Sequence, residues 1–221
     1  MSSAHAPSVG WCAPEVQAEL PRLRLLLAQV QVGRRETLTG ISPPDVQQRL
    51  RERSSRFRGA RAVSIRREPV AAAYRVFFRH IGLDPDVAPT PIEAAVLERM
   101  LRGGFLSGGL LADVLLIALT DTSVPVWALD AETLEGEPGI RPSREGERLG
   151  RGAGALALPA GRLVVADSRG ALALLFDEPA APHAPAARST LLTLFAVQVP
   201  GVPTLYAEEA LWSACNALQA Q

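Results

Sequence analysis

The stretch from residue 90 to residue 130 constrains the fold of this chain more than any other. Thr90 is a good N-cap, Pro91 suits the first helical position, and Glu93 has the spacing of a capping box. Apolar and charged residues then recur at helical spacing until Gly103, which can end a helix. We therefore predict an amphipathic helix with one face toward a core and one toward water.

The next segment, residues 110–119, is apolar except for Asp113. A membrane-spanning helix needs about 20 apolar residues, so this shorter run indicates a helix buried in a protein core. An unpaired carboxylate in that environment costs several kcal/mol or takes up a proton. We therefore expect a hydrogen-bond donor close to Asp113.

Helix patterns dominate the first half of the chain, and strand patterns dominate the second half. The other expected helices cover residues 14–20, 42–57, 69–81 and 204–218. The expected strands cover residues 23–32, 124–129, 139–142, 155–158, 162–167, 171–176 and 191–199. We predict an α+β fold with largely antiparallel strands, formed by a single domain over residues 13–221 and preceded by a flexible tail over residues 1–12.

Composition excludes several classes of function. The chain has 221 residues, 48% of them hydrophobic, and a net charge of zero, so it can bury a core and has no overall field for an acidic partner. Cys12 and Cys215 lack metal-ligand spacing, and no secretory signal is recognisable, which favours a reduced, cytoplasmic protein. Sequence motifs for phosphate loops, serine nucleophiles and zinc are also missing. We expect no metal, no cofactor and no membrane contact.

Arginine is concentrated between residues 49 and 67, where eight arginines occur with one acidic residue, Glu52. The ordinary interpretation is a solvated helix face with local ion pairs. The functional interpretation is a surface for phosphates, which suit the planar fork of arginine. Because Phe57 is the only aromatic residue nearby, base stacking is not supported. The candidate RNA-binding residues are Arg49, Arg53, Arg56, Arg58 and Arg61.

Several motifs occur in the order seen in a known family. The positions that carry them are Thr90-Pro91 with Glu93, Leu106-Ser107-Gly108-Gly109, Ala112-Asp113, Pro125, Leu129-Asp130, Gly136, Arg141, Gly146-Glu147 and Leu163-Val164-Val165-Ala166-Asp167. Over residues 70–199 the chain thereby resembles the B3/B4 domain of the bacterial phenylalanyl-tRNA synthetase beta subunit, in its free-standing form. The resemblance implies mostly antiparallel sheets packed across each other, with flanking helices.

The same resemblance implies a function. In the synthetase, this domain hydrolyses the ester bond of tyrosine that is wrongly attached to the phenylalanine tRNA. This reaction is double-sieve editing, in which a second site removes the wrong amino acid. Free-standing relatives are candidates for editing in trans. The implied partner is therefore tRNA or aminoacyl-tRNA, and the implied enzyme is an aminoacyl-tRNA deacylase.

Compared position by position, the polar pocket of the family is replaced by apolar residues. Leu116 stands where the family helix has asparagine, and Trp127 stands where the synthetase has histidine. Leu175 falls near the small residue of the editing pocket, and Phe195 falls near its recognising glutamate. Together with Asp113, these four residues are the pocket candidates, and the catalytic residues stay unassigned.

Two interpretations remain open. In the first, the domain still binds an aminoacyl-tRNA end and positions water with backbone groups and substrate hydroxyls. In the second, catalysis is lost and an apolar cavity binds a small apolar ligand or a protein partner. In both, Asp113, Asp130 and Glu147 are expected to stabilise the fold by capping turns, whereas Asp177 and Glu178 are expected in a surface turn.

Overall fold

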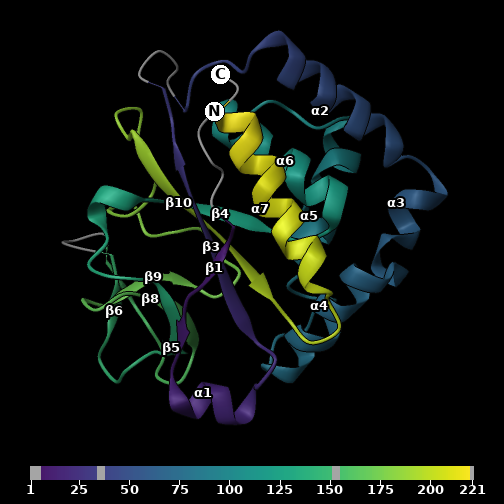
Figure 1. The fold of residues 1–221 in the computed structure, drawn as a ribbon. Coiled ribbons are helices and arrows are strands. Elements are labelled where there is room, and N and C mark those ends of the chain that lie inside the picture. The colour runs from purple at the N-terminus through teal and green to yellow at the C-terminus, as the bar shows by residue number, and fades with distance from the viewer. Residues whose placement is uncertain (1–5, 34–37, 151–154, 220–221) are drawn as a thin grey trace.

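The protein is described by a computed structural model over residues 6–33, 38–150 and 155–219 (Figure 1). Its α-helices are α1 (Pro14–Glu19), α2 (Pro44–Arg56), α3 (Ala60–Ser64), α4 (Pro69–His80), α5 (Pro91–Arg102), α6 (Leu110–Thr122) and α7 (Thr204–Gln219). Its strands are β1 (Ser8–Val9), β2 (Trp11–Cys12), β3 (Arg24–Gln31), β4 (Val126–Asp130), β5 (Gly139–Pro142), β6 (Arg148–Leu149), β7 (Leu156–Ala157), β8 (Leu163–Ala166), β9 (Ala171–Leu174) and β10 (Leu191–Gln198). The short 3₁₀ helices are η1 (Ile65–Arg67) and η2 (Ala131–Thr133).

The described strands form two larger sheets and one small one. The first sheet has the order β1-β3-β10-β4, and all of its neighbouring strands are antiparallel. The second has the order β2-β5-β8-β9, with β2 parallel to β5 and the other pairs antiparallel. Strands β6 and β7 form a separate antiparallel pair. The prediction of a largely antiparallel α+β fold is therefore confirmed.

Strand β10 lies at the centre of the molecule. Strands β3 and β4 flank it, and helices α6 and α7 cover one face of the first sheet (Figure 1). A single apolar cluster contains residues from these helices and from both larger sheets, among them Leu211, Leu194 and Ile140. Because both of its faces are covered, β10 is buried along nearly its whole length. This double burial explains why its sequence is apolar almost throughout instead of alternating.

The N-terminal segment connects the two larger sheets. Residues 8–12 were expected to belong to a flexible tail, but β1 pairs with β3 and β2 pairs with β5. The chain passes between the sheets at Gly10, where an added Cβ would lie 2.3 Å from the Pro138 carbonyl oxygen. Trp11 Nε1 donates a hydrogen bond to the Glu137 carbonyl oxygen at 2.7 Å. The expected tail therefore does not extend over these residues, and its first five residues lie outside the described part of the chain.

The two helices predicted at the middle of the chain are confirmed. Helix α5 begins at the capping box of Thr90 and Glu93, in which the Glu93 carboxylate accepts a hydrogen bond from the Thr90 N–H at 3.1 Å. Gly103 ends the helix with a φ of 76°. Helix α6 starts after Gly109, whose φ is 105° and where an added Cβ would lie 2.9 Å from the Thr39 carbonyl oxygen. Together the two helices form one wall of the cleft that is described next.

Candidate functional site

A cleft of about 610 Å³ lies between helices α5 and α6 on one side and the turn after β9 on the other. Helix α6 lines it with five apolar residues at the spacing of one helix face, namely Leu111, Ala112, Leu115, Leu116 and Leu119. The opposite face of α6 packs into the core. An almost entirely apolar helix therefore forms part of the core and of the cleft at the same time.

Aromatic rings form the inner wall of the cleft. Trp127 on β4 lies opposite Phe195 on β10, and their rings stack with centroids 5.5 Å apart. Phe176, in the turn after β9, has its ring 6.2 Å from that of Trp127 and 4.9 Å from that of Phe78 on α4. Its φ is 71°, a left-handed conformation that is strained for a residue with a side chain. These ring contacts hold the turn in its strained conformation.

Three of the five pocket candidates meet in this cleft. Leu116, Trp127 and Leu175 all belong to its lining. Phe195 is 1% exposed and lies behind Trp127, so it supports the wall without lining the cleft. Asp113 is also 1% exposed and does not belong to the lining. Asp113 was expected in the pocket, but it lies outside the cleft because residue 113 falls on the buried face of α6.

The hydrogen-bond donor expected for Asp113 is present. Its carboxylate accepts hydrogen bonds from Ser42 Oγ at 2.6 Å, from Ser107 Oγ at 2.5 Å and from the Gly108 N–H at 2.8 Å. These bonds attach the loop before α6 and the segment before α2 to the same helix. Asp113 therefore stabilises the fold, and its oxygens are occupied by protein donors.

The charged side chains of the lining come from the second sheet. Arg162 precedes β8, and Asp177 and Glu178 follow the turn after β9. The two segments are joined by the Leu175 N–H, which donates to the Leu163 carbonyl oxygen at 3.0 Å. Glu178 is exposed at the cleft, but partial desolvation by its surroundings, followed by the nearby charge of Asp177, raises its pKa. The cleft thus has an apolar end formed by helices and a charged end formed by strands and their turns.

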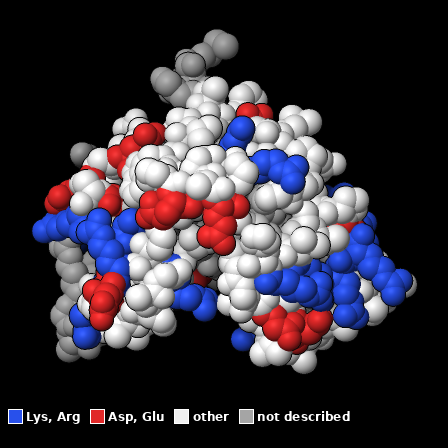
Figure 2. Space-filling view, turned by 90° about the horizontal axis from the view of Figure 1, so that it is seen from below, with Lys and Arg blue, Asp and Glu red and all other residues white. Residues whose placement is uncertain are grey.

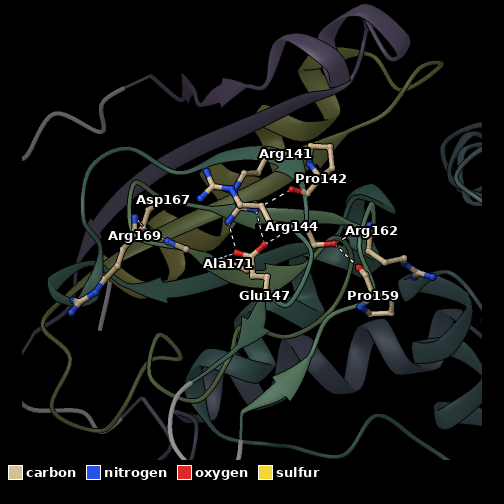
Figure 3. Close-up of polar contacts among 11 residues, drawn as sticks. Arg141, Pro142, Arg144, Glu147, Pro159, Arg162, Asp167, Arg169 and Ala171 are labelled. Carbon is tan, nitrogen blue, oxygen red and sulfur yellow. Dashed lines mark hydrogen bonds and ion pairs between the residues drawn. The ribbon is translucent and has the colours of Figure 1, made fainter.

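The guanidinium of Arg162 has no hydrogen-bond or ion-pair partner among the described residues. Only its backbone N–H donates, to Ser143 Oγ at 3.0 Å. Figure 3 shows the side chain of Arg162 directed away from the neighbouring Arg141 and Glu147. Arg162 also lines an adjoining cavity of about 290 Å³ beside helix α1. This cation is therefore free to bind an anion at the junction of the two hollows.

A buried ion pair stabilises the second sheet (Figure 3). Arg141 on β5 donates to both carboxylate oxygens of Glu147, one of these bonds measuring 2.8 Å. Glu147 also accepts from the backbone N–H groups of Arg144 at 2.8 Å and Ala171 at 3.2 Å. The bond from Arg141 is the main cause that lowers the pKa of Glu147 from 4.5 to about 2, and the same bond raises the pKa of Arg141. Glu147 therefore has the structural role expected from the sequence.

Two of the candidate RNA-binding arginines are engaged within the protein. Arg53 Nη2 donates to Asp121 Oδ2 on α6 at 2.9 Å. Arg61 lies 5.5 Å above the centre of the Phe57 ring. The arginine-rich stretch spans the end of α2, helix α3 and η1.

The remaining three arginine candidates have no side-chain partner within the part of the chain that the structure describes. Arg49 is half-buried, whereas Arg56 and Arg58 are exposed. On the face seen in Figure 2, basic side chains gather toward the side of α3 and α4 and are interrupted by acidic side chains. One such contact joins Arg75 to Asp86 at 2.5 Å. The surface is therefore mixed in charge, with Arg56 and Arg58 as exposed cations.

Sequence patterns did not identify Arg162 or Phe176 as cleft residues. Asp177 and Glu178 were expected in a surface turn, and in the structure the same residues also line the cleft. The sequence contains one signal for this turn: the strand predicted over residues 171–176 ends in Phe176, which two acidic residues, Asp177 and Glu178, follow. Only the tertiary structure places that turn opposite α6.

Two further classes of site can be addressed for the described residues. Within them, no group of three or more His, Cys, Asp and Glu side chains is arranged to hold a metal ion. In the same part of the chain, no helix combines the length and apolar character that crossing a bilayer requires.

No family model matches the chain. Part of it is similar to phenylalanine–tRNA ligase beta subunits. It is 37% identical over 100 residues to that of Xylella fastidiosa (strain Temecula1), a match covering 45% of this chain and 11% of the relative. It is 41% identical over 68 residues to that of Xanthomonas axonopodis pv. citri, covering 31% of this chain and 8% of the relative. The chain therefore spans about a tenth of the length of these relatives. Part of this protein is related to a region of the phenylalanine–tRNA ligase beta subunit.

Proposed function

We propose that this protein contains a B3/B4-like domain that binds the aminoacyl end of a tRNA in the cleft and hydrolyses mischarged aminoacyl-tRNA. The observation that carries the proposal is the meeting of Leu116, Trp127 and Leu175 in one cleft. These are the positions to which the family resemblance assigns the editing pocket. A volume of about 610 Å³ is also in the usual range for a small-molecule site. The similarity to a tRNA ligase subunit supports a substrate that contains tRNA.

The reaction would be the hydrolysis of an ester. Water adds to the ester carbonyl carbon, the bond from that carbon to the ribose oxygen breaks, and the ribose oxygen takes up a proton. The described residues of the lining include no serine, cysteine or histidine, so a covalent enzyme intermediate is not part of the proposal. Asp177 and Glu178 are the side chains in the lining that could accept a proton from water.

The same absence of nucleophiles in the lining favours a second candidate function. A catalytically inactive module could use the apolar cleft to bind a small apolar ligand or a protein partner. This candidate needs no water to be positioned and no charged end in the cleft. The two candidates therefore differ in whether an amino acid is released from tRNA.

Release of radiolabelled amino acid from a panel of mischarged tRNAs tests the proposal. We expect turnover by the wild-type protein and a loss of at least tenfold in Ala94→Trp, because Ala94 is an exposed α5 residue in the cleft lining. Leu97→Trp is the matched control, since Leu97 lies on the same helix, is 50% exposed and does not line the cleft. Turnover on none of the tRNAs would leave only the binding module.

The RNA surface can be tested by measuring tRNA binding at several salt concentrations. Each phosphate contact contributes about one unit to the slope of log K against log salt, so Arg58→Ala should reduce the slope by about one unit. Arg188→Ala removes an exposed arginine from a distant segment of the chain and serves as the control. Equal slopes for wild-type protein and the Arg58→Ala variant would exclude Arg58 from the tRNA surface.

A further inference from the structure

We infer that the cleft selects aminoacyl groups with apolar side chains and discriminates against hydroxylated ones such as tyrosine and threonine. This inference rests on the proposed function and specifies its substrate class. It reverses the selection that the family resemblance implies, in which the editing pocket accepts tyrosine. The chemical groups at the two ends of the cleft account for this selection.

The apolar end offers no side-chain acceptor for the O–H of a substrate hydroxyl. Among the described residues, the lining contains no serine, threonine, asparagine, glutamine, histidine or tyrosine side chain. Its polar side-chain groups are the indole N–H of Trp127 and the charged groups of Arg162, Asp177 and Glu178. A phenol enclosed between α6 and Trp127 would therefore lose water without gaining a side-chain acceptor for its O–H.

The apolar end also offers specific contacts to hydrocarbon and aromatic groups. The rings of Phe78, Trp127 and Phe176 surround one part of the lining, and leucines of α6 form the other. Aromatic side chains gain from edge and face contacts with such rings. Removal of one hydroxyl from the substrate therefore improves the fit without losing a contact.

The charged end can hold the parts that all aminoacyl-tRNAs share. Asp177 and Glu178 are exposed at the cleft and can pair with the α-ammonium group of the aminoacyl ester. Arg162 has no guanidinium partner among the described residues and can pair with a phosphate of the terminal nucleotides. This end orients the substrate, so that its side chain enters the apolar end.

Binding of non-hydrolysable analogues tests the selectivity apart from catalysis. The probes are 3′-phenylalanylamino- and 3′-tyrosylamino-3′-deoxyadenosine, with the valyl and threonyl analogues as a second, nearly isosteric pair. An apolar pocket distinguishes such pairs by roughly 10- to 100-fold. By titration calorimetry, we expect the apolar member of each pair to bind more tightly by a factor in that range. Equal affinities, or tighter binding of the hydroxylated members, would overturn the inference.

Variants identify the cleft wall as the source of the selectivity. Leu116→Asn places an amide in the lining and should strengthen binding of the tyrosyl analogue. The ratio of the phenylalanyl affinity to the tyrosyl affinity should therefore become smaller. Leu101→Asn, at a position on α5 that is 79% exposed, should leave the ratio unchanged. An acetylated α-amine on the phenylalanyl analogue should weaken its binding at least threefold if Asp177 and Glu178 hold the ammonium. If Leu116→Asn does not fold, the wild-type ratios still decide the inference.

The outcomes separate this inference from the proposed function. Turnover of mischarged tRNAs combined with a preference for tyrosyl and threonyl analogues would overturn the inference and retain the deacylase. Apolar preference without turnover would support the inference and reject hydrolysis. Absence of both turnover and analogue binding would reject the proposed function and the inference with it.

Discussion

At the scale of single residues, buried carboxylates determine which side chains are available for chemistry. Asp113 accepts hydrogen bonds from two serine hydroxyls and one backbone N–H. Asp130 accepts from the Glu132 N–H at 3.1 Å and from Ser189 Oγ at 2.6 Å. Since these oxygens are satisfied within the protein, both residues stabilise loops. Asp177 and Glu178, in contrast, are exposed at the charged end of the cleft, where they can meet a ligand.

Replacement of Asp113 by alanine should destabilise the protein strongly. The substitution leaves the Ser42 and Ser107 hydroxyls without their acceptor, and each buried unsatisfied group costs roughly 1–3 kcal/mol. We expect the free energy of unfolding in urea to fall by about 3 kcal/mol. Glu209→Ala, at an exposed position on α7, is the control and should change it by less than about 0.5 kcal/mol. A loss for Asp113→Ala no larger than for the control would contradict this account.

The ion pair of Arg141 and Glu147 should make stability depend on pH. The folded-state pKa of Glu147 is about 2, below its ordinary value of 4.5. Its contribution is therefore complete above pH 4.5 and is lost as the pH falls from 4.5 toward 2. Glu147→Gln should lower stability at neutral pH by roughly 3 kcal/mol and flatten this part of the pH profile.

Thermal unfolding of the wild-type and variant proteins between pH 5 and pH 2 measures this effect. Glu145→Gln is the control because it changes an exposed carboxylate two positions earlier. Its stability should depend on pH in the same way as that of the wild-type protein. If the Glu147→Gln variant and the wild-type protein lose stability in parallel as the pH falls, the pair does not cause the dependence.

At the scale of elements, the turn after β9 is the feature that sequence patterns describe least well. Phe176 has a φ of 71°, yet the residue there is an aromatic one instead of glycine. Its ring lies 5.9 Å from that of Tyr74 and 5.9 Å from that of Phe77, in addition to its contacts with Phe78 and Trp127. The turn is therefore held by packing against α4, in a conformation that its local sequence does not favour.

Two substitutions at Phe176 separate backbone strain from ring packing. Phe176→Ala removes the ring contacts and keeps the strain, so we expect a loss of about 3 kcal/mol in the free energy of unfolding. Phe176→Gly also removes the ring but relieves the strain, so it should be more stable than the alanine variant by about 1 kcal/mol. Urea denaturation of both variants measures the difference. An alanine variant as stable as the glycine variant would show that the backbone conformation carries no strain.

At the scale of the whole molecule, five residues near the N-terminus connect two sheets. The segment over residues 8–12 leaves the first sheet and enters the second at Gly10. Gly10 N–H donates to the Leu25 carbonyl oxygen at 2.8 Å, and Ala13 N–H donates to the Ile140 carbonyl oxygen at 2.9 Å. Backbone hydrogen bonds of this one segment therefore join both sheets.

Substitution of Gly10 by alanine should disturb that connection. The new Cβ would lie 2.3 Å from the Pro138 carbonyl oxygen, so strands must move apart. We expect the free energy of unfolding to fall by roughly 1–3 kcal/mol, which is the usual cost of overpacking. Gly33→Ala is the control because no atom of the described residues, its chain neighbours aside, lies within 4 Å of its added Cβ, and it should be neutral or slightly stabilising. Equal effects of the two substitutions in thermal unfolding would exclude a close approach at Gly10.

Local patterns predicted the α5 capping box, the buried helix α6 and the strand β5 because each has a signal within a few neighbouring residues. The sequence predicts that Asp113 has a hydrogen-bond donor but does not identify it, since Ser42 lies 71 residues away in the sequence. The local count of arginines does not contain the pairing of Arg53 with Asp121, because that contact joins two helices that are distant in the sequence. The RNA-binding role of the arginine-rich stretch stays a prediction.

The sequence by itself determined the α+β class, the order of the main helices and strands, and the need to satisfy a carboxylate within an apolar helix. These properties follow from periodicity and from the cost of burying charge, which act over short distances along the chain. The tertiary structure alone decided that Leu116, Trp127 and Leu175 share one cleft and that Arg162, Asp177 and Glu178 lie at its end. That arrangement depends on the packing of two sheets and two helices against one another, which no local pattern encodes.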